Sequence, residues 1–263
     1  MADFRINLLL VWGLISWMPG LGYDSYDNDL PTIVFLLNED PLNYGATKTI
    51  PEFAKELERA VDCKTTILIA RGTNNQSSFD NTKAIREADV LVVFCRRMAL
   101  PDSQMNIIKN HYMAGKPIIG IRSANHAFSV RETISEGFMD WWEFVPGVLG
   151  CENRGHGPNS EPVKIVAPQD ETNHPWLRNL SFEGWTSEGY LYRSYPLLDP
   201  SARVVIEGYC DGQREPMAWS RISSYGGKVF YSALGEEDDF NFFQFRKLLI
   251  RAFKWSLQDT RMK

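Results

Sequence analysis

Short apolar runs alternate with longer polar segments along the first half of the chain, and this alternation predicts the main elements of the fold. The apolar runs lie at 31–37, 65–70, 88–95 and 117–121. Short uninterrupted runs of this kind are typical of strands buried on both faces of a parallel sheet. Between them, apolar residues recur at helical spacing: Phe53, Leu57, Val61, and later Met105, Ile108, Tyr112. Strands that alternate with helices predict an α/β fold with a doubly wound parallel sheet.

Individual residues indicate where the two helices begin and end. Thr49 can cap the first helix, and Pro51 and Glu52 suit its first turn, where Glu52 would complete a capping box. Pro101 opens the second helix, and Gly115 fits the stop that follows it. The polar segment 71–80 is expected to be a loop.

The second half of the chain has shorter apolar runs. Strand character returns at 162–167, 202–206, 217–220 and 228–232. The last three are close enough in sequence to be antiparallel additions to the sheet. A short helix is expected at 174–177, and a helix rich in Phe and Leu over 239–257, which Asp238 and Asp239 could cap. With no internal repeat or low-complexity tract, one domain is expected over 31–263.

The first 22 residues predict a secretory signal peptide. Arg5 precedes the apolar run 6–18, and Pro19 and the small residues of 20–22 follow it. This run is too short to span a bilayer comfortably. Residues 23–30 are polar and predict a linker, and the domain is expected to be exported, periplasmic or extracellular. Asp3 offsets the charge of Arg5, which leaves an uncleaved apolar extension as the alternative.

Composition narrows the classes of partner. The net charge of −5 comes without a basic tract, which disfavours nucleic acid and anionic membranes as partners, and no integral membrane span is expected.

Four cysteines follow the predicted signal peptide: Cys63, Cys95, Cys151 and Cys210. In an exported protein they could form disulfides with three connectivities, although Cys95 ends an apolar strand and is typical of a buried free thiol. The oligomeric state stays open.

The segment 116–128 organises the candidate chemistry. Its apolar run ends abruptly in polar residues, from Arg122 to His126. The carboxyl end of such a strand is where open α/β sheets bind ligands. A helix that starts near Asn125 would also direct free N–H groups at that crevice.

This segment and six others resemble the ThuA-like (trehalose utilisation) family. The others are NED at 38–40, ADVLVVFCRR at 88–97, VLGCENRGHG at 148–157, NHPWLRNL at 173–180, LYRSYPL at 191–197 and GGKVFYSALGEEDDF at 226–240. Together they cover roughly 31–257. The resemblance implies a flavodoxin-like fold of the class I glutamine amidotransferase type and a link to disaccharide or keto-sugar metabolism.

The resemblance also implies what chemistry is missing. Amidotransferases of this fold carry a cysteine nucleophile in a strand-to-helix elbow, and that position falls on Arg122. Arginine has no lone pair to donate and keeps its proton, so it cannot replace the nucleophile. Ser123 lies one residue beyond the elbow and would point elsewhere. Family members have His before the acidic pair where this chain has Glu236. Amidotransferase or peptidase chemistry is therefore not expected.

Three residues are the candidates for catalysis. His126 could act as general acid or base, while Arg122 and His156 polarise the substrate. Each has a purely structural alternative: His126 bonded to backbone at a helix start, Arg122 in an internal salt bridge to Glu39 or Asp238, and His156 solvated on its loop.

A wider set of residues is expected to contact a carbohydrate. It comprises Arg96, Arg97, Glu39, Asn125, Asn153, Trp142, Tyr192 and Asp238. One of the two adjacent arginines is expected to reach the site while the other faces water. A divalent metal such as zinc on Asp238, His126 and His156 is a further hypothesis.

Two functions from different classes follow. The first is a protein that processes a carbohydrate derivative, with His126 transferring the proton. The second is a non-catalytic sugar-binding or interaction domain that retains the fold. Turnover of a sugar discriminates between them.

Overall fold

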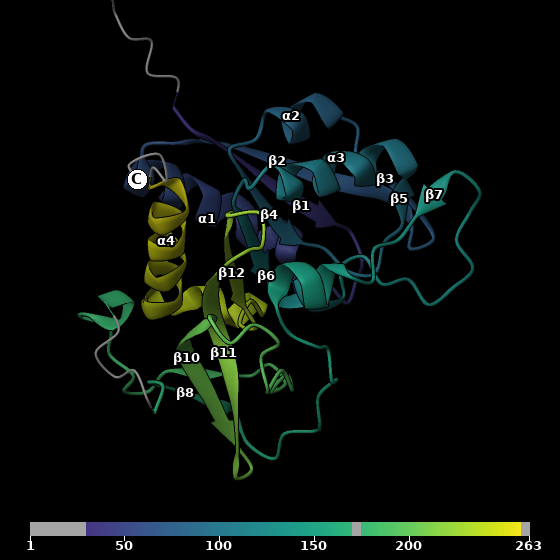
Figure 1. The fold of residues 1–263 in the computed structure, drawn as a ribbon. Helices are drawn as coiled ribbons and strands as arrows, with labels where there is room; N and C mark the ends of the chain where they lie inside the picture. The colour runs from purple at the N-terminus through teal and green to yellow at the C-terminus, as the bar shows by residue number, and fades with distance from the viewer. Residues whose placement is uncertain (1–29, 170–174, 259–263) are drawn as a thin grey trace, which may run out of the picture.

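A computed structural model describes residues 30–169 and 175–258. The predicted signal peptide, nearly all of the predicted linker and His174 lie outside these residues. Within them, one mixed sheet has the strand order β3-β2-β1-β4-β6-β12-β11-β10-β8-β9 (Figure 1). Its strands are β1 (Thr32–Asn38), β2 (Lys64–Thr73), β3 (Gln76–Ser78), β4 (Val90–Phe94), β6 (Ile118–Ile121), β8 (Val163–Val166), β9 (Thr186–Ser187), β10 (Arg203–Cys210), β11 (Gln213–Ile222) and β12 (Lys228–Ser232).

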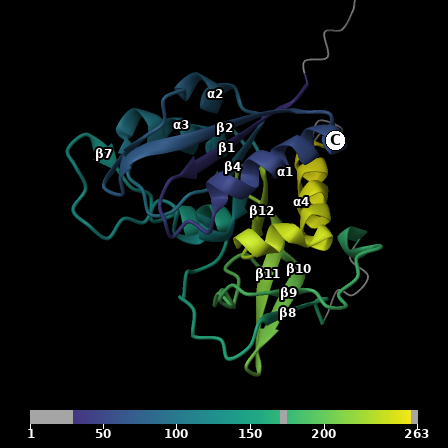
Figure 2. The same ribbon diagram turned by 180° about the vertical axis from the view of Figure 1, so that it is seen from behind.

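Five neighbouring strands are parallel and covered on both faces, while the edge strand β3 runs antiparallel to β2. Strands β2, β1, β4, β6 and β12 run in one direction. Helices α1 (Ala46–Val61) and α4 (Phe243–Leu257) pack together, as do α2 (Thr82–Glu87) and α3 (Asp102–Met113), and the two pairs lie on opposite faces (Figures 1 and 2). The Phe35 ring of β1 lies 6.0 Å from the ring of Phe253 in α4. Burial on both faces explains the uninterrupted apolar run of β1, and the predicted doubly wound α/β fold is confirmed.

The second half of the sheet is antiparallel. Strands β11, β10, β8 and β9 each run opposite to the neighbour before them. Strand β12 joins the two halves, because it is antiparallel to β11 but parallel to β6. The antiparallel strands predicted for the second half are therefore confirmed. Strand β12 differs in one respect, because along its other edge it pairs in parallel with β6.

The start of α1 differs from the expectation. The helix begins at Ala46, with Gly45 before it, and Thr49 lies inside it, donating from its hydroxyl to the Gly45 carbonyl. The cause is the turn after β1: Asn43 is anchored by donating to the carbonyl of Phe94, and its own carbonyl accepts from Ala46 N–H. This anchor starts the helix one turn before the predicted capping box. The expected stop at Gly115 is confirmed by its N–H bond to the Tyr112 carbonyl.

Two further boundaries differ. Part of the predicted loop 71–80 is strand, because β2 continues to Thr73 and pairs with β3. The last helix, α4, starts at Phe243 after a separate 3₁₀ turn, η4 (Glu237–Asn241). The Asp239 carboxylate accepts from the N–H groups of Gly235 and Glu236, so it holds η4 and does not cap α4.

The remaining segments are short. They are the 3₁₀ turns η1 (Arg122–His126) and η3 (Pro175–Leu177), the π-helical η2 (Phe144–Leu149), and the paired strands β5 (Leu100–Pro101) and β7 (Phe138–Met139). The four cysteines are buried free thiols, as expected for Cys95. Among the described residues, no helix combines the length and apolar character needed to cross a bilayer.

Candidate functional site

The elbow that the sequence places at Arg122 is present in the structure. Arg122 follows β6 and opens η1 with φ of +44°, in the left-handed region that side chains other than glycine rarely adopt. Small residues flank it: a Cβ atom on Gly120 would lie 3.1 Å from the Ala124 Cβ and 3.0 Å from the side chains of Leu149 and Tyr231. The tight strand-to-turn geometry is therefore retained around an arginine.

The Arg122 side chain is fully buried and held by polar groups. Its Nη1 donates to the carbonyls of Ala233 at 2.6 Å and Tyr190 at 3.2 Å, and its Nη2 donates to the Glu236 carboxylate at 2.9 Å. The guanidinium carbon lies 4.1 Å from the ring centre of Tyr192 and 4.7 Å from that of Tyr44. Such contacts stabilise the cation. An internal salt bridge was expected, but its partner is Glu236, not Glu39 or Asp238.

Arg122 and Glu236 thus contact each other at the two positions where the resemblance implied a cysteine and a histidine. Burial raises the pKa of Glu236, and the Arg122 charge opposes that rise. The carboxylate is engaged by a fixed cation and the guanidinium holds no lone pair. Arg122 cannot act as a nucleophile, and Glu236 has no thiol beside it to activate, so the Cys–His chemistry of an amidotransferase cannot run on this pair.

Tyr192 brings the three catalytic candidates together. Besides contacting Arg122, its ring lies 6.4 Å from the His126 ring and 5.9 Å from the His156 ring. Its hydroxyl is 2.6 Å from that of Tyr44. His156 also stacks on Tyr190, with ring centres 4.4 Å apart and planes only 9° apart. Arg122, His126 and His156 therefore surround one buried tyrosine.

His126 is buried and neutral. Burial, followed by the charges of Arg97 and Arg96, lowers the pKa of His126 from 6.5 to about 3. Its Nδ1 contacts the Asn125 side-chain oxygen and so carries the hydrogen, which leaves Nε2 as an acceptor. Asn153 donates to the Asn125 carbonyl at 3.1 Å, which links the loop of His156 to this turn. A neutral imidazole with this pKa cannot serve as an acid near pH 7.

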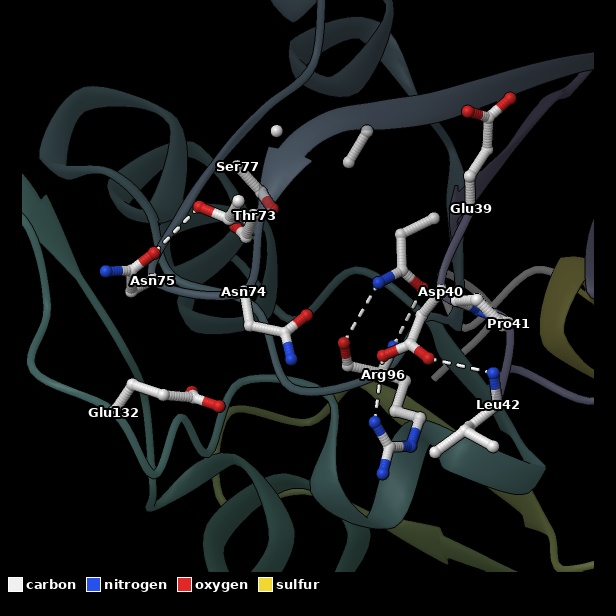
Figure 3. A pocket seen from close by; sticks show the side chains of 13 residues that line it. Glu39, Asp40, Pro41, Leu42, Thr73, Asn74, Asn75, Ser77, Arg96 and Glu132 are labelled. Carbon is white, nitrogen blue, oxygen red and sulfur yellow. Dashed lines mark hydrogen bonds and ion pairs between the residues drawn. The ribbon is translucent and has the colours of Figure 1, made fainter.

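A polar cavity of about 720 Å³ opens at the carboxyl ends of β1 and β2 (Figure 3). Arg96 lines it and pairs with Asp40 at 2.8 Å, while Asn38 exchanges hydrogen bonds with the Arg96 backbone. Figure 3 shows Glu132 and Asn75 on the side opposite Asp40. The lining groups are mostly carboxylates, amides and hydroxyls: Asn38, Glu39, Asp40, Thr73, Asn74, Asn75, Ser77 and Glu132. The location is the one expected for ligands of this sheet.

Of the other predicted site residues, some line this cavity and others lie elsewhere. Glu39 lines the cavity, whereas Arg97 does not: it donates to the Ser129 carbonyl at 3.0 Å and is half-buried instead of facing water. Asp238 lies at a different cavity beside α1. Trp142 is exposed, and its indole donates to Asp140.

The hypothesis of a metal on Asp238, His126 and His156 finds no support in the described residues. No group of three or more His, Cys, Asp or Glu within 30–169 and 175–258 could hold a metal ion.

The sequence did not single out several residues that the structure places here. Tyr44 and Tyr190 contact Arg122, and Asn74, Asn75 and Glu132 line the cavity. The polar segment after β2 could have indicated the two asparagines, because it follows the carboxyl end of a strand. Nothing local marks Tyr44, Tyr190 or Glu132.

Comparisons with known proteins agree with the family resemblance found in the sequence. A family model described as ThuA, trehalose utilisation, matches residues 43–256. Among solved structures, a ThuA-like protein from Bacteroides uniformis has a TM-score of 0.64 at 15% identity, covering 91% of this chain and 97% of that one. One from Parabacteroides merdae has a TM-score of 0.59 at 13% identity, covering 89% and 92%. The mmIFT52 N-terminal domain has a TM-score of 0.50 at 13% identity, covering 86% and 98%. At these identities the structures show a shared fold. The comparison with curated proteins gives no significant match.

Proposed function

Because the chain belongs to the ThuA (trehalose utilisation) family, we propose that it binds a carbohydrate derivative, without amidotransferase chemistry, in the polar cavity beside the elbow. The observation that carries the second part is the Arg122–Glu236 pair, in which a buried arginine and a glutamate occupy the positions of the thiol and the imidazole that amidotransferase chemistry needs. We therefore place the ligand among the polar groups of the cavity next to the elbow.

The lining of the cavity suits a polyhydroxylated ligand. Sugar hydroxyls donate to carboxylates and accept from amides and guanidinium groups, and Glu132, Asn74 and Arg96 supply one of each. The volume of about 720 Å³ lies within the range of small-molecule sites and has room for a disaccharide or keto-sugar. The Asn74 side chain makes no hydrogen bond to another described residue, so its amide is available to a ligand.

Calorimetric titration with trehalose, glucose and a 3-keto glucoside tests the proposal. Removing two lining groups in Asn74→Ala/Glu132→Ala should weaken binding at least tenfold, since neither side chain supports the fold through a hydrogen bond. The matched control is Asn106→Ala/Glu136→Ala, which removes the same two residue types from exposed positions outside the cavity. Equal binding by both double variants, or no binding by the native protein, contradicts the proposal.

A second candidate function is processing of the sugar, favoured by the gathering of His126 and His156 around Tyr192. In this scheme the neutral His126 accepts a proton at Nε2 as a weak base. Product analysis by mass spectrometry of each sugar incubated with native protein and His126→Gln decides between the two. Product that disappears in the variant establishes turnover, and unchanged sugar with native-strength binding supports the binding function.

A further inference from the structure

A second cavity, of about 520 Å³, lies on the antiparallel side of the molecule, away from the elbow. It is bounded by η3, the end of α4, and the paired ends of β10 and β11. Trp176, Trp255, Arg203, Arg221, Ser201 and Ser220 contribute most of its wall. None of these residues belongs to the site described above.

The charge of this cavity is opposite in sign to that of the first one. Its lining includes two arginines and no Asp or Glu among the described residues, in a chain whose net charge is −5. Arg221 is neutralised by Asp199 at 2.6 Å. Arg203 has no hydrogen bond or ion pair to any described residue. A guanidinium that is free at the edge of a concave surface is suited to a phosphate or carboxylate.

Ser220 is the second feature that indicates a ligand. It is 8% exposed and lines the cavity, yet no hydrogen bond joins its hydroxyl to another residue of the described chain. Its oxygen is not among the fully buried polar atoms that lack a partner, so it is accessible from the cavity and can bond to a ligand there. Ser220 faces Arg203 across the β10–β11 ladder, so the free hydroxyl and the free cation are neighbours on one face of the sheet.

Two indole rings supply an apolar surface beside these polar groups. The rings of Trp176 and Trp255 have centres 5.4 Å apart at 67°, an edge-to-face arrangement. The apolar face of a sugar ring packs on indole surfaces, and a sugar also carries hydroxyls that would pair with Ser220. A purely aromatic ligand would leave that hydroxyl unpaired.

We propose that this cavity binds an anionic sugar, with the ring against Trp176 and Trp255, a ring hydroxyl on Ser220, and the phosphate or carboxylate on Arg203. The phosphate and the carboxylate share this recognition chemistry. The site is independent of the carbohydrate site proposed above, where three carboxylates and one arginine disfavour anions.

Calorimetric titration of the full chain with glucose 6-phosphate, glucuronate, glucose and inorganic phosphate tests the site. At least one of the two anionic sugars should bind, and whichever binds more tightly identifies the anion. Arg203→Gln should weaken that binding tenfold or more, and Ser220→Ala several-fold. Arg86→Gln makes the same change of charge at an exposed position in α2 and should bind like the native protein.

Each further outcome counts for or against the site. Unchanged binding in Asn74→Ala/Glu132→Ala supports a separate cavity, and loss of binding there overturns it. Inorganic phosphate that binds as tightly as glucose 6-phosphate overturns the role of the ring. Native-strength binding by Arg203→Gln, or dissociation constants above about 10 mM for both anionic sugars, overturns the proposal.

Discussion

Arg122 adopts a backbone conformation that is costly for a residue with a side chain, of the order of 1–3 kcal/mol. Such a conformation persists only where the surroundings over-determine it. The Tyr231 hydroxyl donates to the Arg122 carbonyl at 2.8 Å, and three acceptors hold the guanidinium. The elbow therefore persists in this chain because packing and hydrogen bonds hold it, although its occupant cannot act as a nucleophile.

At this residue scale, the ion pair gives a first prediction. Glu236→Ala leaves the Arg122 cation buried without its counter-charge and should lower the free energy of unfolding by about 3 kcal/mol. Arg122→Met/Glu236→Ala removes the stranded charge as well and should recover part of this loss. Urea unfolding of the two variants and the native protein measures the difference. A double variant less stable than Glu236→Ala would show that the pair is not coupled in this way.

The sequence predicts some residues of the site and misses others for a physical reason. Arg122 and His126 are found because they follow a strand that is recognisable locally. Glu236 is named by the resemblance but not predicted as the partner of Arg122, because it lies 114 positions further along and only the fold brings the two together. The low pKa of His126 is equally non-local, since it depends on burial and on arginines from other segments.

At the scale of elements, the β2–β3 hairpin forms one wall of the polar cavity. Gly72 allows the hairpin to close: its φ is +113°, and a Cβ atom there would lie 2.1 Å from the Gln76 carbonyl oxygen. That distance is much shorter than a van der Waals contact. Any side chain at position 72 must therefore push β2 and β3 apart and break hydrogen bonds between them. The wall and the residues on it, including Asn74, depend on this glycine.

Gly72→Ala should therefore abolish sugar binding while the rest of the sheet stays folded, because β3 is the edge strand of the described sheet and its neighbouring strand there is β2. Calorimetric titration measures the loss, and amide hydrogen exchange should show faster exchange in 71–78 alone. Gly212→Ala is the control, since Gly212 also has positive φ but nothing lies within 4 Å of the added atom. Native binding by Gly72→Ala would refute the dependence of the cavity on this hairpin.

The elements themselves were predictable to different degrees. The buried parallel strands are marked by their apolar runs, since both faces need apolar side chains. The start of α1 is not marked by a local pattern, because it depends on Asn43, which a hydrogen bond across 51 positions anchors to β4. The extension of β2 and the direction of β12 relative to β6 likewise depend on pairing partners that local patterns do not contain.

For the whole molecule, two buried histidines make stability depend on pH. Burial lowers the pKa of His111 to about 4 and is the main cause that lowers that of His126 to about 3, from 6.5. The unfolded chain binds a proton at each histidine as the pH falls through 6.5, and the folded chain does not. Stability is therefore greatest above pH 6.5 and should fall by about 2.5 kcal/mol between pH 7 and 5.5.

Urea unfolding across that pH range measures this loss. In His126→Gln the fall in the free energy of unfolding over this pH range should be only about half as large, because one of the two proton-binding groups is gone from the unfolded chain. The raised pKa values of Glu236 and Asp239 act in the opposite direction, because a carboxylate that is protonated more readily in the folded than in the unfolded chain adds stability as the pH falls. A native profile that is flat from pH 7 to 5.5 would mean that these imidazoles can be protonated in the folded state.

Export is the last proposal at the scale of the whole chain, and it rests on residues 1–22. Disulfides do not add to it, since all four cysteines after that segment are buried free thiols, which any compartment permits. Mass spectrometry of the protein recovered from its own cells should give a mature chain that starts near Tyr23. The control is Leu9→Arg/Leu10→Arg, which interrupts the apolar run of 6–18 and should leave the chain uncleaved. An intact amino terminus in the native protein would contradict export by this route and would leave the fold and both cavities unaffected.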